Sequence, residues 1–133
     1  MVFNNTLRIT TVAIMLTLSY LGIAEAATIS VDCRFENRVD RLRSKATVRG
    51  YGLPRGSKYY AKIRSGSSGV WVSSKPKSGR RLEFEFDSHT DEIGKTIIPD
   101  SFLSDGVVVA VIRKFKKNGK VADNSSTCEV RNK

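Results

Sequence analysis

Apolar and polar residues alternate at every second position along most of the chain after residue 26, which is the pattern of β-strands with one buried face. This pattern, or a short apolar run, marks seven segments: 29–35, 46–48, 58–64, 70–72, 82–86, 107–112 and 121–130. Turn-forming residues separate these segments, and no segment has the period of an amphipathic helix, although 91–104 has room for one short turn. The sequence therefore predicts an all-β fold, an antiparallel two-sheet sandwich of about seven strands.

The number and spacing of these strands resemble those of immunoglobulin and fibronectin type III-like sandwiches over about residues 29–131. The resemblance is one of pattern, because Trp71 has no cysteine in the strands where the immunoglobulin pattern places one, and there is no tyrosine corner. The chain is also similar to small exported bacterial proteins of unknown function. The resemblance implies a fold and no activity.

The first 26 residues have the three parts of a secretory signal peptide. Arg8 gives a positive start, an uncharged and mainly apolar run extends from Ile9 to Ile23, and Ala24-Glu25-Ala26 offers small residues for cleavage before Ala27. The apolar run is shorter than the roughly 20 residues that span a bilayer. We expect a signal peptide at 1–26, a single domain at 27–133, no transmembrane anchor after cleavage, and a secreted or periplasmic location; an uncleaved anchor is the alternative.

Two cysteines remain in the exported chain, Cys33 and Cys128, near its two ends. An even number of cysteines in an exported domain predicts a disulfide bond. Cys33 lies on the apolar face of the first predicted strand, beside Val31 and Phe35. Two free thiols or half of a metal site are the alternatives, although His89 is the only histidine and no CxxC motif occurs.

The sequence 117–120, Lys-Asn-Gly-Lys, predicts a two-residue type I′ hairpin turn. Such a turn places Lys117 opposite Lys120, Lys114 opposite Asp123, and Val109 opposite Cys128. One face of the last two strands then collects the predicted core residues Val107, Val109, Val111, Phe115, Ala122, Cys128 and Val130. The same register turns Val108 and Ile112 outward.

The chain is strongly basic, with a net charge of +10 that loss of Arg8 and Glu25 leaves unchanged. One group of basic residues lies between the first two strands, at Arg38, Arg41, Arg43 and Lys45. A second surrounds the last hairpin, at Arg113, Lys114, Lys116, Lys117 and Lys120. This charge favours an acidic partner.

An immunoglobulin topology makes 58–64 and 107–117 neighbours. Their predicted outward residues then form a face with an apolar centre and a basic rim: Lys58, Tyr60, Lys62, Arg64, Val108 and Ile112. Exposed apolar residues of this kind often mark a binding site. A covering loop such as 91–104, or plain β-propensity, is the alternative explanation.

Residues with catalytic potential are few. His89 lies in an acidic segment, 87–92, which is better explained as a solvated loop than as a cation site. Glu83 and Glu85 lie on one face of a predicted strand and could act as a glycosidase pair, but they are more simply a solvent-facing acidic row that pairs with Lys45 and Arg49 on a neighbouring strand. We expect no enzyme activity, no cofactor and no metal.

The sequence therefore favours non-catalytic extracytoplasmic binding of an acidic macromolecule, either an envelope polyanion or an acidic protein. Nucleic acid is less favoured, because few aromatic residues accompany the basic ones. One alternative is a structural or assembly subunit, including a homo-oligomer, that uses an apolar sheet face. Another is a secreted inhibitor or effector.

Overall fold

The computed structural model describes residues 27–66, 68–90, 92–116 and 119–132. These residues form strands and no helix, as predicted. The ten strands are β1 (Thr28–Arg38), β2 (Arg41–Tyr51), β3 (Lys58–Arg64), β4 (Val70–Val72), β5 (Lys77–Ser78), β6 (Arg81–Asp87), β7 (Thr96–Ile97), β8 (Val107–Lys114), β9 (Lys120–Thr127) and β10 (Glu129–Arg131). All seven predicted segments are found. The strands beyond seven are short: β5 and β7 are additional, and 121–130 is divided at Cys128 into β9 and β10.

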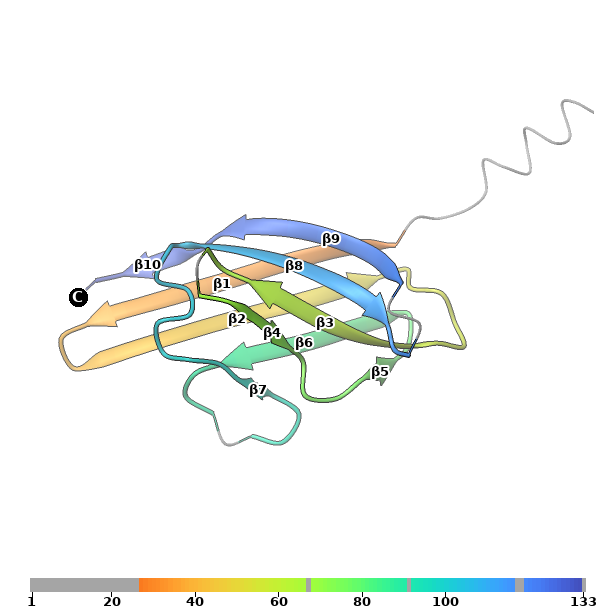
Figure 1. Ribbon diagram of the computed structural model, residues 1–133, viewed down its shortest axis with the longest axis horizontal. Coiled ribbons are helices and arrows are strands. Elements are labelled where there is room, and N and C mark those ends of the chain that lie inside the picture. Colours follow the sequence, from red (N-terminus) through yellow and green to blue (C-terminus); the bar gives the residue numbers. More distant parts are fainter. Residues whose placement is uncertain (1–26, 67, 91, 117–118, 133) are drawn as a thin grey trace, which may run out of the picture.

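The strands form two five-stranded sheets, and the longest of them run along the long axis of the molecule (Figure 1). The first sheet has the order β10-β1-β2-β6-β7, and the second has the order β4-β3-β8-β9 with β5 also paired to β3. The predicted neighbours 58–64 and 107–117 are indeed paired, as β3 and β8. The predicted signal peptide, 1–26, lies outside the described residues.

Both sheets contribute side chains to one hydrophobic core. The first sheet supplies Val48, Phe84 and Phe86, while the second supplies Tyr59, Ile63 and other fully buried residues. Ile98, Phe102 and Leu103, from the segment between β7 and β8, are also buried there. Among the described residues, every buried core residue lies between 29 and 128.

The register of the last hairpin differs from the prediction. Val109 lies opposite Ser125, Val107 opposite Thr127, and Ile112 opposite Ala122. Lys114 donates its backbone N–H to Gly119, so residues 115–118 connect the strands in place of a two-residue turn. The predicted pairs Lys114–Asp123 and Val109–Cys128 are therefore wrong, and Lys117 and Asn118 of the predicted turn lie outside the described residues.

This difference reverses the two faces of β8. An irregularity between Ile112 and Arg113 shifts the pairing near the loop, and the main register is displaced by three residues from the predicted one. An odd displacement exchanges the inward and outward faces of a strand. Val108 and Ile112 are accordingly buried in the core, so the prediction that they face outward is wrong.

Among the described residues, no helix is long and apolar enough to cross a membrane.

Candidate functional site

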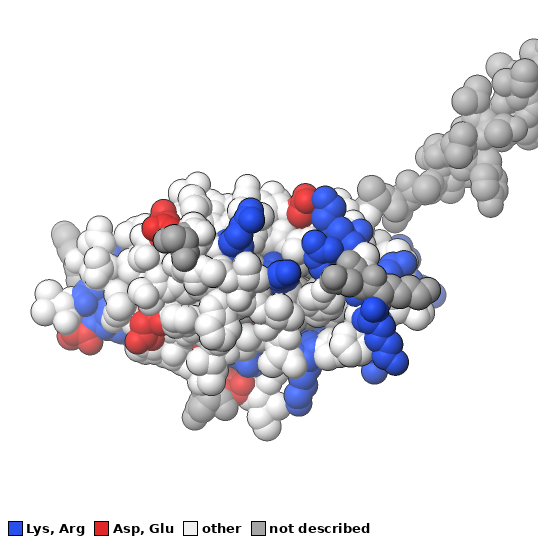
Figure 2. Space-filling model, in the orientation of Figure 1, with Lys and Arg blue, Asp and Glu red and all other residues white. Residues whose placement is uncertain are grey.

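Three segments that are distant in the sequence meet at one end of the molecule. They are 52–58, between β2 and β3; 77–81, from β5 to the start of β6; and 114–116, at the end of β8. These segments contain no acidic residue. Their basic residues, which we call the basic end, are Arg55, Lys58, Lys77, Arg80, Arg81, Lys114 and Lys116. Figure 2 shows Lys and Arg side chains gathered at the end of the molecule where β5 and the start of β9 lie.

Backbone contacts hold the three segments together. Leu53 donates its N–H to the carbonyl oxygen of Arg80 at 3.3 Å, and Phe115 donates its N–H to that of Lys58 at 2.8 Å. The buried hydroxyl of Tyr59 donates to the carbonyl oxygen of Pro54, which fixes the first segment to the core. The cations are thus presented by loops with defined positions.

The loops at residues 56–58 and 114–116 border an open cleft of about 440 Å³. Lys58, Lys114 and Lys116 line it together with the aromatic ring of Phe115. Phe115 is 43% exposed, although the predicted register placed it in the core. The cleft therefore combines positive charge with an accessible apolar ring.

Lys116 is the one described non-glycine residue with a left-handed backbone, at φ 73°. Lys120, at the start of β9, forms an ion pair with Asp123 at 2.9 Å. Lys117, which the sequence grouped with these residues, lies outside the described part of the chain.

The opposite end of the molecule, which we call the far end, has a different composition. Its segments 36–43 and 87–105 contain seven acidic and four basic residues. Arg43 and Asp87 form a two-fold hydrogen-bonded ion pair there, with distances of 3.0 Å for Nε to Oδ1 and 2.6 Å for Nη2 to Oδ2. Opposite charges at the far end thus pair with each other.

The Asp87 carboxylate is almost fully buried. Burial raises its pKa, but the hydrogen bond from Arg43 and the backbone N–H of His89 lower it further, so that the pKa of Asp87 lies below its ordinary 3.8. Asp87 in turn raises the pKa of Arg43. Both groups are therefore charged at neutral pH, and the pair joins β2 to β6.

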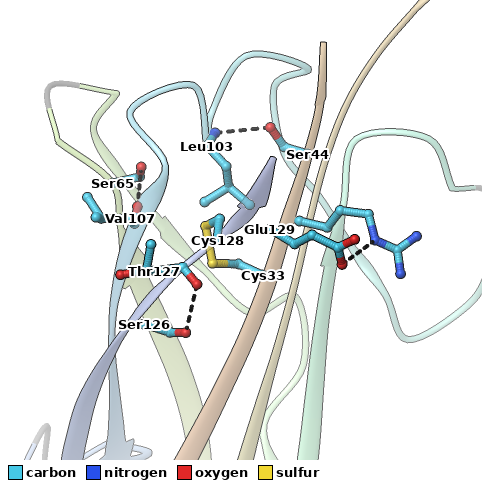
Figure 3. Close-up of a disulfide and its surroundings, with 10 residues drawn as sticks. Cys33, Ser44, Ser65, Leu103, Val107, Ser126, Thr127, Cys128 and Glu129 are labelled. Carbon is cyan, nitrogen blue, oxygen red and sulfur yellow. Dashed lines mark hydrogen bonds and ion pairs between the residues drawn. A yellow bond between two sulfur atoms is a disulfide. The ribbon is translucent and has the colours of Figure 1, made fainter. Parts of the chain in front are cut away.

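The predicted disulfide joins Cys33 to Cys128, with Cα atoms 4.6 Å apart. Cys33 lies on β1, and Cys128 lies where the chain leaves β9 in the second sheet and begins β10 in the first (Figure 3). Cys128 also donates its N–H to Gly106 at 2.7 Å. Next to it Leu103 donates its N–H to the Ser44 hydroxyl at 3.0 Å. The bond thus closes the far end across both sheets.

The outer face of the second sheet carries exposed or half-buried valines, which we call the valine face: Val70, Val72, Val107, Val109 and Val111. Lys62 and Arg64 lie between them on β3, because Val72 and Val111 flank Lys62 while Val70 and Val109 flank Arg64. Tyr60 and Arg113 lie opposite each other on the same two strands. This face therefore combines apolar and basic residues as predicted. Its apolar residues on β8 are Val107, Val109 and Val111, in place of the predicted Val108 and Ile112.

The remaining candidates have structural partners. Glu83 pairs with Arg49 at 3.2 Å as predicted, whereas Glu85 pairs with Lys95 at 3.5 Å in place of Lys45. His89 Nε2 lies 3.0 Å from the Asp100 carboxylate. In the described part of the chain, no group of three or more His, Cys, Asp or Glu side chains is arranged to hold a metal ion.

Four of the seven residues of the basic end were not predicted from the sequence. Lys58, Lys114 and Lys116 were named, but Arg55, Lys77, Arg80 and Arg81 were not. No single segment signals the site, because its charge density arises only when three turns meet. The available signal was that each of these turns lacks an acidic residue.

Comparisons with protein-family models, with curated proteins and with solved structures found no match to this chain.

Proposed function

We propose that this protein is an exported, non-catalytic binding domain that holds an acidic partner of the cell envelope, a polyanion or an acidic protein, at its basic end. The observation that carries the proposal is the meeting of seven basic residues and no acidic one in three adjoining segments. Like charges held close together lower stability, and an anionic partner offsets that cost. Elsewhere on the surface, cations such as Arg49 already have carboxylate partners.

Export is supported by the features of residues 1–26 and by the Cys33–Cys128 disulfide, since such bonds persist in oxidising compartments. The fold type that we propose is an immunoglobulin or fibronectin type III-like sandwich. Its support is the strand order, because β1-β2-β6 and β3-β8-β9 correspond to the A-B-E and C-F-G strands of that fold. This fold serves many binding domains and by itself names no partner.

We assign no catalytic role. A nucleophile needs a base and an orienting group within reach, and the one histidine, His89, lies at the far end beside Asp100. The two cysteines are bonded to each other and do not offer a thiol. Glu83 and Glu85 are each held by a cation of a neighbouring segment.

A matched pair of triple variants tests the proposal. The basic-end triple variant replaces Lys58, Lys114 and Lys116 with Gln. The control, which we call the far-end triple variant, replaces Arg38 of the far end together with Lys45 on β2 and Arg131 on β10 with Gln. Both lose three positive charges, so a difference between them reports position and not net charge. Retention on immobilised heparin is measured across a salt series. We expect the basic-end triple variant to lose about three units of the slope of log binding against log salt, and the far-end variant much less.

Equal losses in the two triple variants would show that only net charge matters, and the basic end would no longer be a site. Retention that does not depend on salt would contradict electrostatic binding altogether.

The valine face supports a second candidate function, assembly with another subunit. Val107 and Val109 are 44% and 40% exposed, which is unusual on a solvated sheet face. With Lys62 and Arg64 they border a groove of about 360 Å³. Sedimentation over a range of concentrations tests this role, with Val109→Thr as the variant. An apolar self-interface should weaken in the variant and change little with salt.

A further inference from the structure

An exposed aromatic ring among lysines distinguishes the basic end from a plain cationic patch. Phe115 lies between Lys114 and Lys116 in the chain, and its N–H is bonded to the carbonyl oxygen of Lys58. This bond ties the loop to the start of β3, and Phe115 is 43% exposed there. A soluble polyanion needs the lysines but gains little from the ring. An apolar ring beside cations fits a surface that is anionic outside and apolar beneath.

The place where the chain enters the domain points to the same surface. Thr28, the first residue of β1, lies opposite Tyr51, directly before the 52–58 segment of the basic end. Only residues 24–27 separate Thr28 from the apolar run that ends at Ile23. Four extended residues span at most about 14 Å. As long as that run is attached to a membrane, the basic end therefore lies close to the headgroups.

The charges along the molecule give the domain a preferred orientation at such a surface. The basic end carries seven cations in segments without acids, whereas the far-end segments carry an excess of acids. An anionic surface attracts the first and repels the second, and this attraction acts within about a Debye length of roughly 8–10 Å. The end nearest to the membrane during export is thus also the end that an anionic membrane attracts.

We infer that the basic end docks on a bilayer of anionic phospholipids. Phe115 enters the headgroup region, while Lys58, Lys114 and Lys116 contact lipid phosphates around it. The inference rests on the proposed function, because the same cations bind the acidic partner, and it specifies the envelope polyanion as the anionic surface of a lipid bilayer.

The first test uses the exported chain, residues 27–133, and cosedimentation with vesicles. One vesicle contains equal parts of phosphatidylcholine and phosphatidylglycerol, and the other contains phosphatidylcholine alone. We expect binding to the anionic vesicle only. The basic-end triple variant should bind it about a hundredfold more weakly, since each lysine near an anionic surface contributes about fivefold. The far-end triple variant should bind like the wild type.

The variant Phe115→Ser separates the lipid inference from the proposed function. It keeps every charge and the backbone bond to Lys58, so retention on heparin should not change. Binding to the anionic vesicle should fall by about fivefold, the effect of exposing half of a buried aromatic side chain. Equal vesicle binding by variant and wild type overturns the inference, and so does retention on heparin without any vesicle binding. Both of those results leave the proposed function standing. If the wild type showed no salt-dependent retention on heparin, the lipid inference and the proposed function would both be overturned.

A fluorescence measurement tests which surface touches the lipid. Trp71 is the only tryptophan and lies on β4, beside the valine face. A second protein carries Trp71→Phe and Phe115→Trp, so that its single tryptophan lies at the basic end. We expect brominated lipid in anionic vesicles to quench the second protein and not the wild type. Quenching of Trp71 and not of the tryptophan at position 115 would overturn docking through the basic end.

Discussion

The two ends of this domain use their polar residues in opposite ways. At the far end, Arg43 and Asp87 are paired, Ser44 bonds to Asp100 and Leu103, and the disulfide joins β1 to the start of β10. At the basic end, loops 52–58, 77–81 and 114–116 bring cations together without a carboxylate among them. The far end thus pairs opposite charges within the fold, while the basic end gathers like charges in segments that contain no acidic residue. If the proposed function is right, this contrast places stability and binding at opposite ends of the molecule.

The largest effect on stability is expected from removal of the disulfide bond. Replacement of Cys33 and Cys128 with Ser removes a link between residues 95 apart, which should lower the free energy of unfolding by about 4–5 kcal/mol in the chain-entropy model. For a domain of this size the melting temperature should fall by about 15–20 °C. Calorimetry measures both. At a temperature where the variant is folded, its heparin retention should equal that of the wild type.

A change in retention by the folded cysteine variant would show that the far end also shapes the binding surface, and the two ends would not be independent.

The next effect comes from the buried ion pair. The variant Asp87→Asn leaves Arg43 without its charged partner and should lower the free energy of unfolding by about 3 kcal/mol. Because the folded pKa of Asp87 is lowered, its contribution is complete above the ordinary value of 3.8 and is lost as the pH falls through the lower folded pKa. Urea unfolding across this acidic range measures the effect. The wild type should lose stability as the pH falls below about 4, and the variant should lose less.

If wild type and variant lost stability in parallel over that pH range, another carboxylate would be responsible.

The strand that connects the two ends, β8, gives a control for both. Val108 is fully buried and Val109 is 40% exposed, so Val108→Ala should cost about 2 kcal/mol and Val109→Ala less than about 0.5 kcal/mol. Neither should alter heparin retention, because neither changes charge. Chemical unfolding of the two variants measures the difference, and a larger cost at Val109 would restore the register expected from the sequence.

That register was the part of the fold that sequence reasoning placed wrongly, for a physical reason. Strands such as 29–35 and 82–86 alternate, so their buried faces can be read from the sequence. The run 107–112 is apolar at every position, and its pattern does not distinguish the two faces. The prediction then depended on a two-residue turn, whereas residues 115–118 form the connection. An error in the predicted turn length therefore exchanged the predicted inward and outward faces of β8.

The disulfide was predictable although that register was wrong. Cys33 shares its face with Val31 and Phe35 in an alternating strand, which was predicted correctly. Cys128 is buried for a different reason from the predicted one, because it lies at the passage between two sheets and not on a strand. The basic end was only half predictable, since the contact between 52–58 and 77–81 arises from tertiary packing that sequence spacing does not reveal.

The smallest effect on stability is expected at Lys116, where the roles of the charge and of the backbone conformation can be tested separately. Lys116 has a left-handed backbone, which costs a residue with a side chain about 1 kcal/mol and glycine almost nothing. Lys116→Gly removes this cost but loosens the unfolded chain by a similar amount, so the free energy of unfolding should change by less than about 0.5 kcal/mol. Lys116→Ala removes the same charge and keeps the strain.

Both variants should reduce the slope of log heparin binding against log salt by about one. Chemical unfolding should show the Gly variant to be at least as stable as the Ala variant. A basic end that served stability would show the opposite, with both variants less stable and retention unchanged. Equal retention losses at unequal stability would instead show that the charge at this end acts on the partner and not on the fold.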